Sequence, residues 1–228
     1  EVAWDPDREA VVAWVRRRFG ALVLKERLSN EPPEPRLAAA LLAEHAGRDP
    51  AVALALDAAA QQLQHRVAFL RRARPSLELP DLFDLAAIVA ARCEGRRSFR
   101  ELRDVPLAES LDWRQRQAVD TWAPLRVTLP SGSAAPLSYE TLGQPPVLAA
   151  RIQQLFGLAQ TPRVAGEAVV LHLLAPNNRP AQVTSDLAGF WRGSYADVRK
   201  DLRGRYPRHS WPDDPLLALP EDRPRRRS

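Results

Sequence analysis

The residues best suited to bind a charged ligand lie in one segment near the end of the chain, residues 183–212. Between residues 192 and 209 the chain has six basic residues and two acidic residues. Arginine forks contact phosphate oxygens, and aromatic rings stack on nucleic-acid bases. The segment therefore predicts a nucleic-acid surface, whose candidate contact residues are Arg192, Arg199, Lys200, Arg203, Arg205, Tyr206 and Arg208.

Two short helices should carry these residues. Thr184 or Ser185 can cap the first helix, and Ser194 can cap a second helix that ends near Gly204. At about 100° per residue, the second helix has a buried side, a basic side and an acidic side. The basic side carries Arg199, Lys200 and Arg203.

The aromatic residues of the segment have two readings. Beside the arginines they suit base stacking, but they could equally pack inward beneath a solvated helix face. Periodicity alone leaves both readings open for Trp191, Tyr195 and Trp211.

No other part of the sequence offers a catalytic set. The two lysines, Lys25 and Lys200, follow no glycine-rich phosphate-binding loop, and no acidic pair stands ready for magnesium. One cysteine and four scattered histidines do not make a zinc site. His172 lies in an apolar run and is expected to be a core residue. We therefore expect no catalytic residue, metal or cofactor in this chain.

Composition indicates a packed globular protein, with 45% apolar and 27% charged residues. Cys93 is expected to be a buried, inert thiol. No apolar run approaches the roughly 18 residues of a membrane span, and no signal peptide is apparent, so a cytoplasmic protein is expected. Methionine is absent even at position 1, which suggests a piece of a longer protein. The net charge of +5 permits a nucleic-acid partner, although a GC-rich genome would also raise the arginine content.

The elements that position these residues predict an α+β fold in four parts. A β-hairpin at residues 1–30 has strands at 1–4 and 10–24, and a proline-rich linker follows it. The run at 10–24 also satisfies helical spacing, but Gly20 and the apolar residues after it favour a strand. A helical subdomain at 31–123 has helices at 36–46, 51–73, 81–92, 99–111 and 113–122. An α/β subdomain at 124–219 has strands at 125–129, 134–139 and 168–174, a helix at 147–156 and two closing helices. Residues 220–228 are expected to be a disordered tail.

Residues 182–212, QVTSDLAGFWRGSYADVRKDLRGRYPRHSWP, resemble the C-terminal signature of HrpB-type bacterial DExH-box ATP-dependent helicases. Shorter stretches extend the resemblance over nearly the whole chain: RFGALVL at 18–24, WAP at 122–124, PSGS at 130–133, PPVLAAR at 145–151 and QLFG at 154–157. In that family two RecA-like motor domains precede winged-helix, helical-bundle and OB-like modules, and this region comes last.

The resemblance implies a non-catalytic accessory module of a helicase. Residues 1–28 would supply the last strands of an OB-like barrel, and ATP and magnesium would belong to the missing motor. RNA or single-stranded nucleic acid and the helicase's own motor would be its partners, with no membrane involved and the oligomeric state open. The alternative is a protein-interaction module that docks through the helical stretch at residues 36–122.

Overall fold

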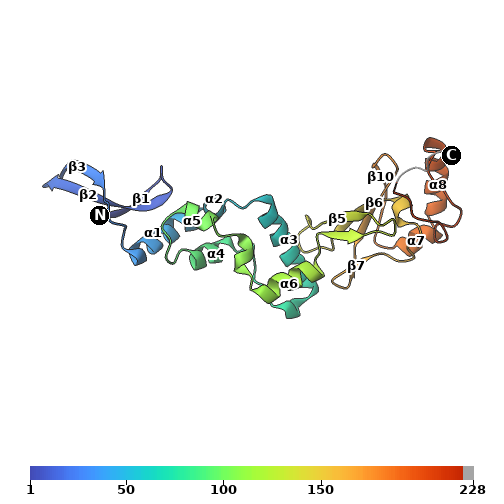
Figure 1. The fold of residues 1–228 in the computed structure, drawn as a ribbon, viewed down its shortest axis with the longest axis horizontal. Helices are drawn as coiled ribbons and strands as arrows, with labels where there is room; N and C mark the ends of the chain where they lie inside the picture. Colours follow the sequence, from blue (N-terminus) through green and yellow to red (C-terminus); the bar gives the residue numbers. More distant parts are fainter. Residues whose placement is uncertain (223–228) are drawn as a thin grey trace. The chain divides into compact units, whose positions relative to one another are not determined.

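The computed structural model describes residues 1–222, and the chain divides into two compact units (Figure 1). The first unit comprises residues 1–64 and 80–112, and the second comprises residues 65–79 and the chain from residue 113 onward. The helical subdomain predicted at 31–123 is thus shared between the units. The α+β class is confirmed: antiparallel strands come first, helices follow, and a mixed sheet comes last. Residues 223–228, most of the predicted tail, lie outside the described residues.

The chain begins with a three-stranded antiparallel sheet in the order β1-β2-β3. The strand predicted at residues 10–24 is divided in two, because Gly20 adopts a φ of 58° and reverses the chain. A positive φ costs glycine little, so this position permits a tight turn. The strands are β1 Val2–Asp5, β2 Ala10–Phe19 and β3 Leu22–Leu28.

The helix predicted at residues 51–73 is also divided in two, and the break is local. Ala55 ends the first helix with a left-handed φ of 45°. The Asp57 carboxylate then accepts a hydrogen bond from the Ala60 amide at 2.8 Å, which starts the next helix. The resulting elements are α2 Pro50–Leu54 and α3 Ala58–Ala73, preceded by α1 Pro35–Arg48.

The other helices of the first unit are shorter than predicted. Ser98 and Glu101 form a reciprocal capping box at the start of α5. Pro106 cannot donate a helical hydrogen bond, and the predicted helix at 99–111 becomes an α-helix followed by a 3₁₀ turn. These elements are α4 Leu85–Arg92, α5 Phe99–Arg103 and η2 Leu107–Ser110.

Apolar side chains from these helices and the β1–β2 strands form the core of the first unit. Leu42, Leu82 and Leu102 are at most 1% exposed. Cys93 is buried, as predicted, and burial raises its pKa. The Trp4 ring stacks on His45 at 4.7 Å and meets Phe99 at 4.8 Å, so β1 is packed on the helices.

Three helical pieces enter the second unit: the C-terminal part of α3, η1 Pro75–Leu77 and α6 Trp113–Trp122. Arg66 of α3 is 6% exposed and holds the end of α6. Its guanidinium donates to the Ala123 carbonyl at 2.7 Å, the Val119 carbonyl at 3.2 Å and the Asp120 carboxylate at 2.7 Å. The bond to the Ala123 carbonyl satisfies an acceptor beyond the last turn of the helix, whereas the Val119 carbonyl also accepts from the Ala123 amide at 2.9 Å.

A five-stranded mixed sheet in the order β10-β9-β6-β5-β4 organises the rest of the second unit. Only the central β6–β9 pairing is parallel. The turn at residues 130–133 joins β4 to β5 as predicted. The strands are β4 Arg126–Thr128, β5 Ala134–Ser138, β6 Val147–Arg151, β9 Val170–Leu174 and β10 Pro180–Thr184, with a small separate pair, β7 Arg163–Val164 and β8 Glu167–Ala168.

The helix predicted at residues 147–156 is wrong. Residues 147–151 form the middle strand of the sheet, and η3 Ile152–Leu155 follows as a single 3₁₀ turn. Leu148 and Ala150 face the core with period two, and Ile152, Leu155 and Phe156 are fully buried beyond the strand. The buried residues alternate in the strand and cluster in the turn, and the two patterns together gave an apolar spacing that also fits a helix.

Two helices close the second unit as predicted, α7 Leu187–Arg192 and α8 Tyr195–Arg205. Beyond them the chain returns to η3. The Glu221 amide donates to the Gln153 carbonyl at 2.9 Å, and the Asp222 carboxylate accepts from Gln154 at 2.7 Å. Both residues belong to the stretch that composition assigned to a disordered tail. Within residues 1–222 no helix is both long enough and apolar enough to span a membrane.

Candidate nucleic-acid interface

Helix α7 owes its start to Asp186, not to the predicted caps Thr184 and Ser185. The Asp186 carboxylate accepts a hydrogen bond from the Gly189 amide at 2.9 Å. A Cβ atom on Gly189 would lie 2.2 Å from the other oxygen of that carboxylate, so a side chain there would displace the cap. Ser194 takes the capping position of α8 as predicted, although its side chain makes no capping hydrogen bond.

A cluster of four buried rings fixes α7 and α8 to η3. We call Phe156, Phe190, Trp191 and Tyr195 the aromatic cluster. Trp191 lies 4.9 Å from Phe190, 5.2 Å from Tyr195 and 6.2 Å from Phe156, measured between ring centroids. All four rings are at most 8% exposed. The aromatic cluster is therefore the core on which α7 and α8 pack, and these helices carry most of the candidate basic residues.

The polar atoms of the buried aromatic residues have partners inside the unit. Trp191 Nε1 donates to the Leu158 carbonyl at 2.8 Å, and the Tyr195 hydroxyl donates to the Pro212 carbonyl at 2.9 Å. Burial raises the pKa of Tyr195 to about 12. Trp211 is 9% exposed and donates Nε1 to the Tyr206 carbonyl at 2.9 Å. Of the two readings of these aromatics, the structure supports inward packing rather than base stacking.

Two of the candidate arginines are engaged in ion pairs. Arg199 is paired with Asp213, and its side chain is 23% exposed. Arg205 is paired with Asp201 one helical turn earlier at 2.9 Å. The helical spacing placed Arg199 on the same side as Lys200 and Arg203. The structure shows that Arg199 is engaged by a carboxylate and less exposed than that prediction implied.

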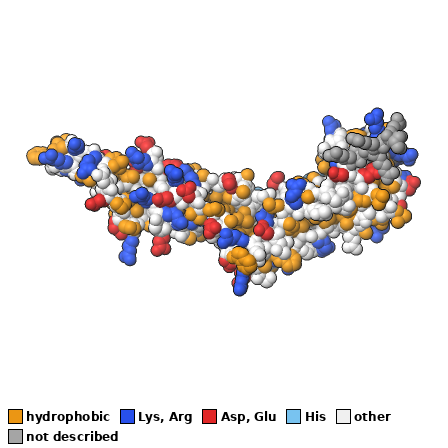
Figure 2. Space-filling model, viewed as in Figure 1, with side chains coloured by type: hydrophobic (Ala, Val, Ile, Leu, Met, Phe, Trp, Pro, Cys, Tyr) orange, Lys and Arg blue, Asp and Glu red, His pale blue; other side chains and the backbone are white. Residues whose placement is uncertain are grey.

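The other four candidate cations are exposed and make no ion pair with any residue of the described chain. Figure 2 shows Lys and Arg side chains around the C-terminal helices of the second unit. An unpaired guanidinium or ammonium group keeps its full charge available to an anion. We call these four residues the open cations: Arg192, Lys200, Arg203 and Arg208.

Tyr206 is the one predicted contact residue with an aromatic ring, and it is half-buried. Its ring meets His209 edge-on at 6.2 Å. Burial lowers the pKa of His209, and the charge of Arg151 lowers it further, so the imidazole is held toward its neutral form. Tyr206 therefore keeps only part of its surface for a ligand.

A groove of about 480 Å³ lies beside Arg205 and Tyr206, between α8 and the start of β10. Its lining adds Asn177 and Arg179 from the β9–β10 loop. Arg179 is exposed and unpaired among the described residues, but sequence reasoning did not select it. This loop reaches the groove as the turn of the β9–β10 hairpin, and β10 was not predicted.

The fold and the matched families define the class of the chain: it belongs to the family of ATP-dependent helicase C-terminal regions. The model of that family matches residues 88–215. A second family model, described as the connector region of the ATP-dependent RNA helicase HrpB, matches residues 1–28. The resemblance to HrpB-type helicases is thereby confirmed.

Among individual proteins, the chain is similar to the ATP-dependent RNA helicase HrpB of Escherichia coli strain K12. The two are 35% identical over 240 residues, which cover 100% of this chain and 29% of that protein. A crystal structure of the E. coli DExH-box NTPase HrpB matches with a TM-score of 0.73 and 34% identity over 96% of this chain. A crystal structure of the Escherichia coli DEAH/RHA helicase HrpB matches with a TM-score of 0.61 and 33% identity over 92% of this chain. The chain spans 28% of each of those structures.

Proposed function

We propose that this chain is a non-catalytic accessory module of an ATP-dependent RNA helicase and that it binds single-stranded RNA through the open cations. The single observation that carries the proposal is their lack of acidic partners, while Arg199 and Arg205 on the same helix are paired. The E. coli relative is named an RNA helicase, which supports RNA as the ligand. ATP and magnesium would be bound by motor domains elsewhere in such a helicase.

The open cations set the size of the expected effect. If each contacts one phosphate, the logarithm of affinity should fall with the logarithm of salt concentration with a slope of about −3 for single strands. The groove beside Arg205 offers room for part of a nucleotide next to this charged surface. Binding of this kind would depend little on base sequence, because phosphate contacts do not distinguish bases.

Fluorescence anisotropy of the 228-residue chain with a labelled single-stranded RNA tests the proposal. Lys200→Gln combined with Arg203→Gln should weaken binding and reduce the salt slope by about 1.4. The matched control is Arg36→Gln with Arg100→Gln, two exposed arginines of the first unit with no ion pair among the described residues. Equal affinity for the Lys200 and Arg203 variant and the parent would reject the open cations as the binding surface.

A second candidate function is docking on another protein or on the helicase motor. Trp113 at the start of α6 favours it, because this large apolar side chain is 65% exposed. A pull-down with a helicase motor region tests this function. Docking predicts capture by the parent chain and loss of capture by Trp113→Ala, whereas RNA affinity should not change.

The three-stranded sheet of residues 1–28 would be the end of an OB-like barrel in the complete helicase, as the family resemblance implies. We infer this placement from the match to the HrpB connector region.

A further inference from the structure

The two faces of the β2–β3 ribbon differ in charge pairing: one carries ion pairs, and the other carries only basic charged residues. Residues directly opposite each other across the strands share a face, and neighbours along a strand alternate. Arg16 lies opposite Glu26, whereas the next pair places Arg17 opposite Lys25. The two pairs therefore point to opposite faces of the same ribbon.

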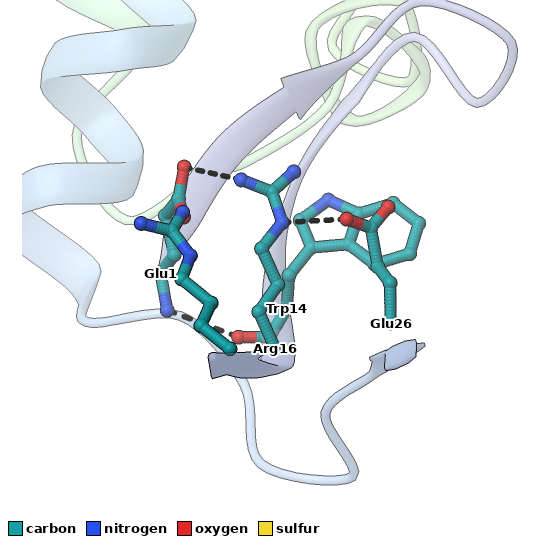
Figure 3. Close-up of polar contacts among 5 residues, drawn as sticks. Glu1, Trp14, Arg16 and Glu26 are labelled. Atoms are coloured by element: carbon teal, nitrogen blue, oxygen red, sulfur yellow. Dashed lines mark hydrogen bonds and ion pairs between the residues drawn. The ribbon is translucent and has the colours of Figure 1, made fainter. Parts of the chain in front are cut away.

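On the first face both arginines, Arg16 and Arg18, have carboxylate partners. Arg16 binds the Glu26 carboxylate at 2.6 Å and the Glu1 carboxylate at 2.6 Å (Figure 3). Arg18 binds the other oxygen of Glu1 at 2.8 Å. These contacts lower the pKa of Glu1 and raise that of Arg16, so both groups are held in their charged forms. The face is neutralised within the sheet.

The second face carries three cations and no acid. Arg17 lies opposite Lys25, and Val15 lies opposite Arg27, two residues along each strand. All three cations are exposed, and none makes an ion pair within residues 1–222. Directly opposed residues lie about 5 Å apart, and residues two apart lie about 7 Å along a strand. The three charges thus share a small patch, which we call the ribbon cations: Arg17, Lys25 and Arg27.

This arrangement costs the isolated sheet stability. Like charges directly opposite each other on a sheet repel, and a single acidic residue at position 17 or 25 would remove the conflict. Locally unfavourable choices without structural compensation are typical of functional surfaces. At the tip of the same ribbon, Phe19 is 76% exposed and lies opposite Leu22, 69% exposed. Figure 2 shows orange and blue side chains dominating this tip.

We propose that the ribbon cations bind the phosphate backbone of single-stranded RNA, with the Phe19 ring placed to stack on a base. A patch of three cations fits a polyanion, and an exposed aromatic beside it is a feature of single-strand binding surfaces. The inference rests on the proposed function only for the identity of the ligand. Its residues lie in the first unit, whereas the open cations lie in the second.

The test compares the two faces in the 228-residue chain. Arg17→Gln with Lys25→Gln removes two charges from the second face, and Arg16→Gln with Arg18→Gln removes two from the first. Anisotropy with the same labelled single-stranded RNA should show roughly tenfold weaker binding at ~50 mM salt and a salt slope reduced by about 1.4 for the second-face variant alone. The melting temperature of that variant should stay equal or rise, since repulsion is removed.

Equal weakening by both variants would overturn the proposal, because only net charge would then matter. Unchanged affinity in the second-face variant would overturn it as well. If that variant weakens binding while Lys200→Gln with Arg203→Gln does not, the open cations fail and the ribbon cations stand. The reverse result removes the ribbon alone. Phe19→Ala should weaken binding further without changing the salt slope, which separates stacking from charge.

Discussion

Replacing Trp191 by alanine separates a core aromatic from a base-stacking one. The indole is 8% exposed and touches three other rings of the aromatic cluster. Its Nε1 donates to the Leu158 carbonyl at 2.8 Å. Truncation would remove all of these contacts at once and leave a cavity between α7, α8 and η3.

The contacts set the magnitude. Truncating a buried aromatic to alanine costs about 3 to 5 kcal/mol of unfolding free energy. Each aromatic pair contributes roughly 0.5 to 1.5 kcal/mol beyond its buried area, which favours the upper part of that range for Trp191. For a unit of this size, 1 kcal/mol corresponds to about 3 °C, so the melting temperature should fall by about 9 to 15 °C.

Thermal unfolding followed by near-ultraviolet circular dichroism provides the assay, and the chain contains its own control. Trp113 is 65% exposed, so Trp113→Ala should change the unfolding free energy by no more than about 0.5 kcal/mol. Trp191→Phe keeps a ring but loses the bond to Leu158, and its melting temperature should lie between those of Trp191→Ala and the parent. A Trp191→Ala variant that melts with the parent but binds RNA more weakly would refute the assignment of this ring to the core.

Two further predictions concern the second unit. Burial raises the pKa of Tyr195 to about 12, above about 10 in the unfolded chain, so its contribution to stability is complete below about pH 10 and is lost as the pH rises toward 12. Urea unfolding from pH 8 to 11.5 should show this decline, and a decline equally steep in Tyr195→Phe would contradict it. Arg66→Met should lower the unfolding free energy by about 2 to 4 kcal/mol, because the Val119 and Ala123 carbonyls lose a charged donor. A urea midpoint equal to that of the parent would show that water replaces these bonds.

Sequence patterns correctly predicted the elements that are determined by residues within or next to the element itself. Residues 113–122 read as one helix and form α6, and the PSGS turn between two alternating strands forms the β4–β5 hairpin. The patterns failed where distant partners decide. Residues 147–151 are a strand because β5 pairs with them on one side and β9 pairs with them in parallel on the other, and the pattern within these residues shows neither partner. The turn at Gly20 was not predicted, because one uninterrupted strand over residues 10–24 also fitted the pattern.

The candidate interface shows the same division. The sequence located α7 and α8 and the basic residues on them, because caps and periodicity are local. It could not show that Arg199 is paired with Asp213, 14 residues further along the chain. Nor could it decide which way Trp191 points, because the helix face that meets η3 depends on the position of Phe156. Charge pairing and burial are properties of the folded chain, so they required the structure.

The way α3 contributes to the second unit has a consequence for the order in which the chain can fold during synthesis. Phe69 is fully buried in that unit and meets the ring of Tyr139 at 5.8 Å. Translation at about 5 to 20 residues per second would add the intervening 70 residues in about 4 to 14 s. Throughout that interval the Phe69 ring lacks the Tyr139 ring, its partner in the folded unit. Residues 65–79 therefore mark a stretch where a nascent chain would be open to chaperones, and where slow translation would prolong the exposure.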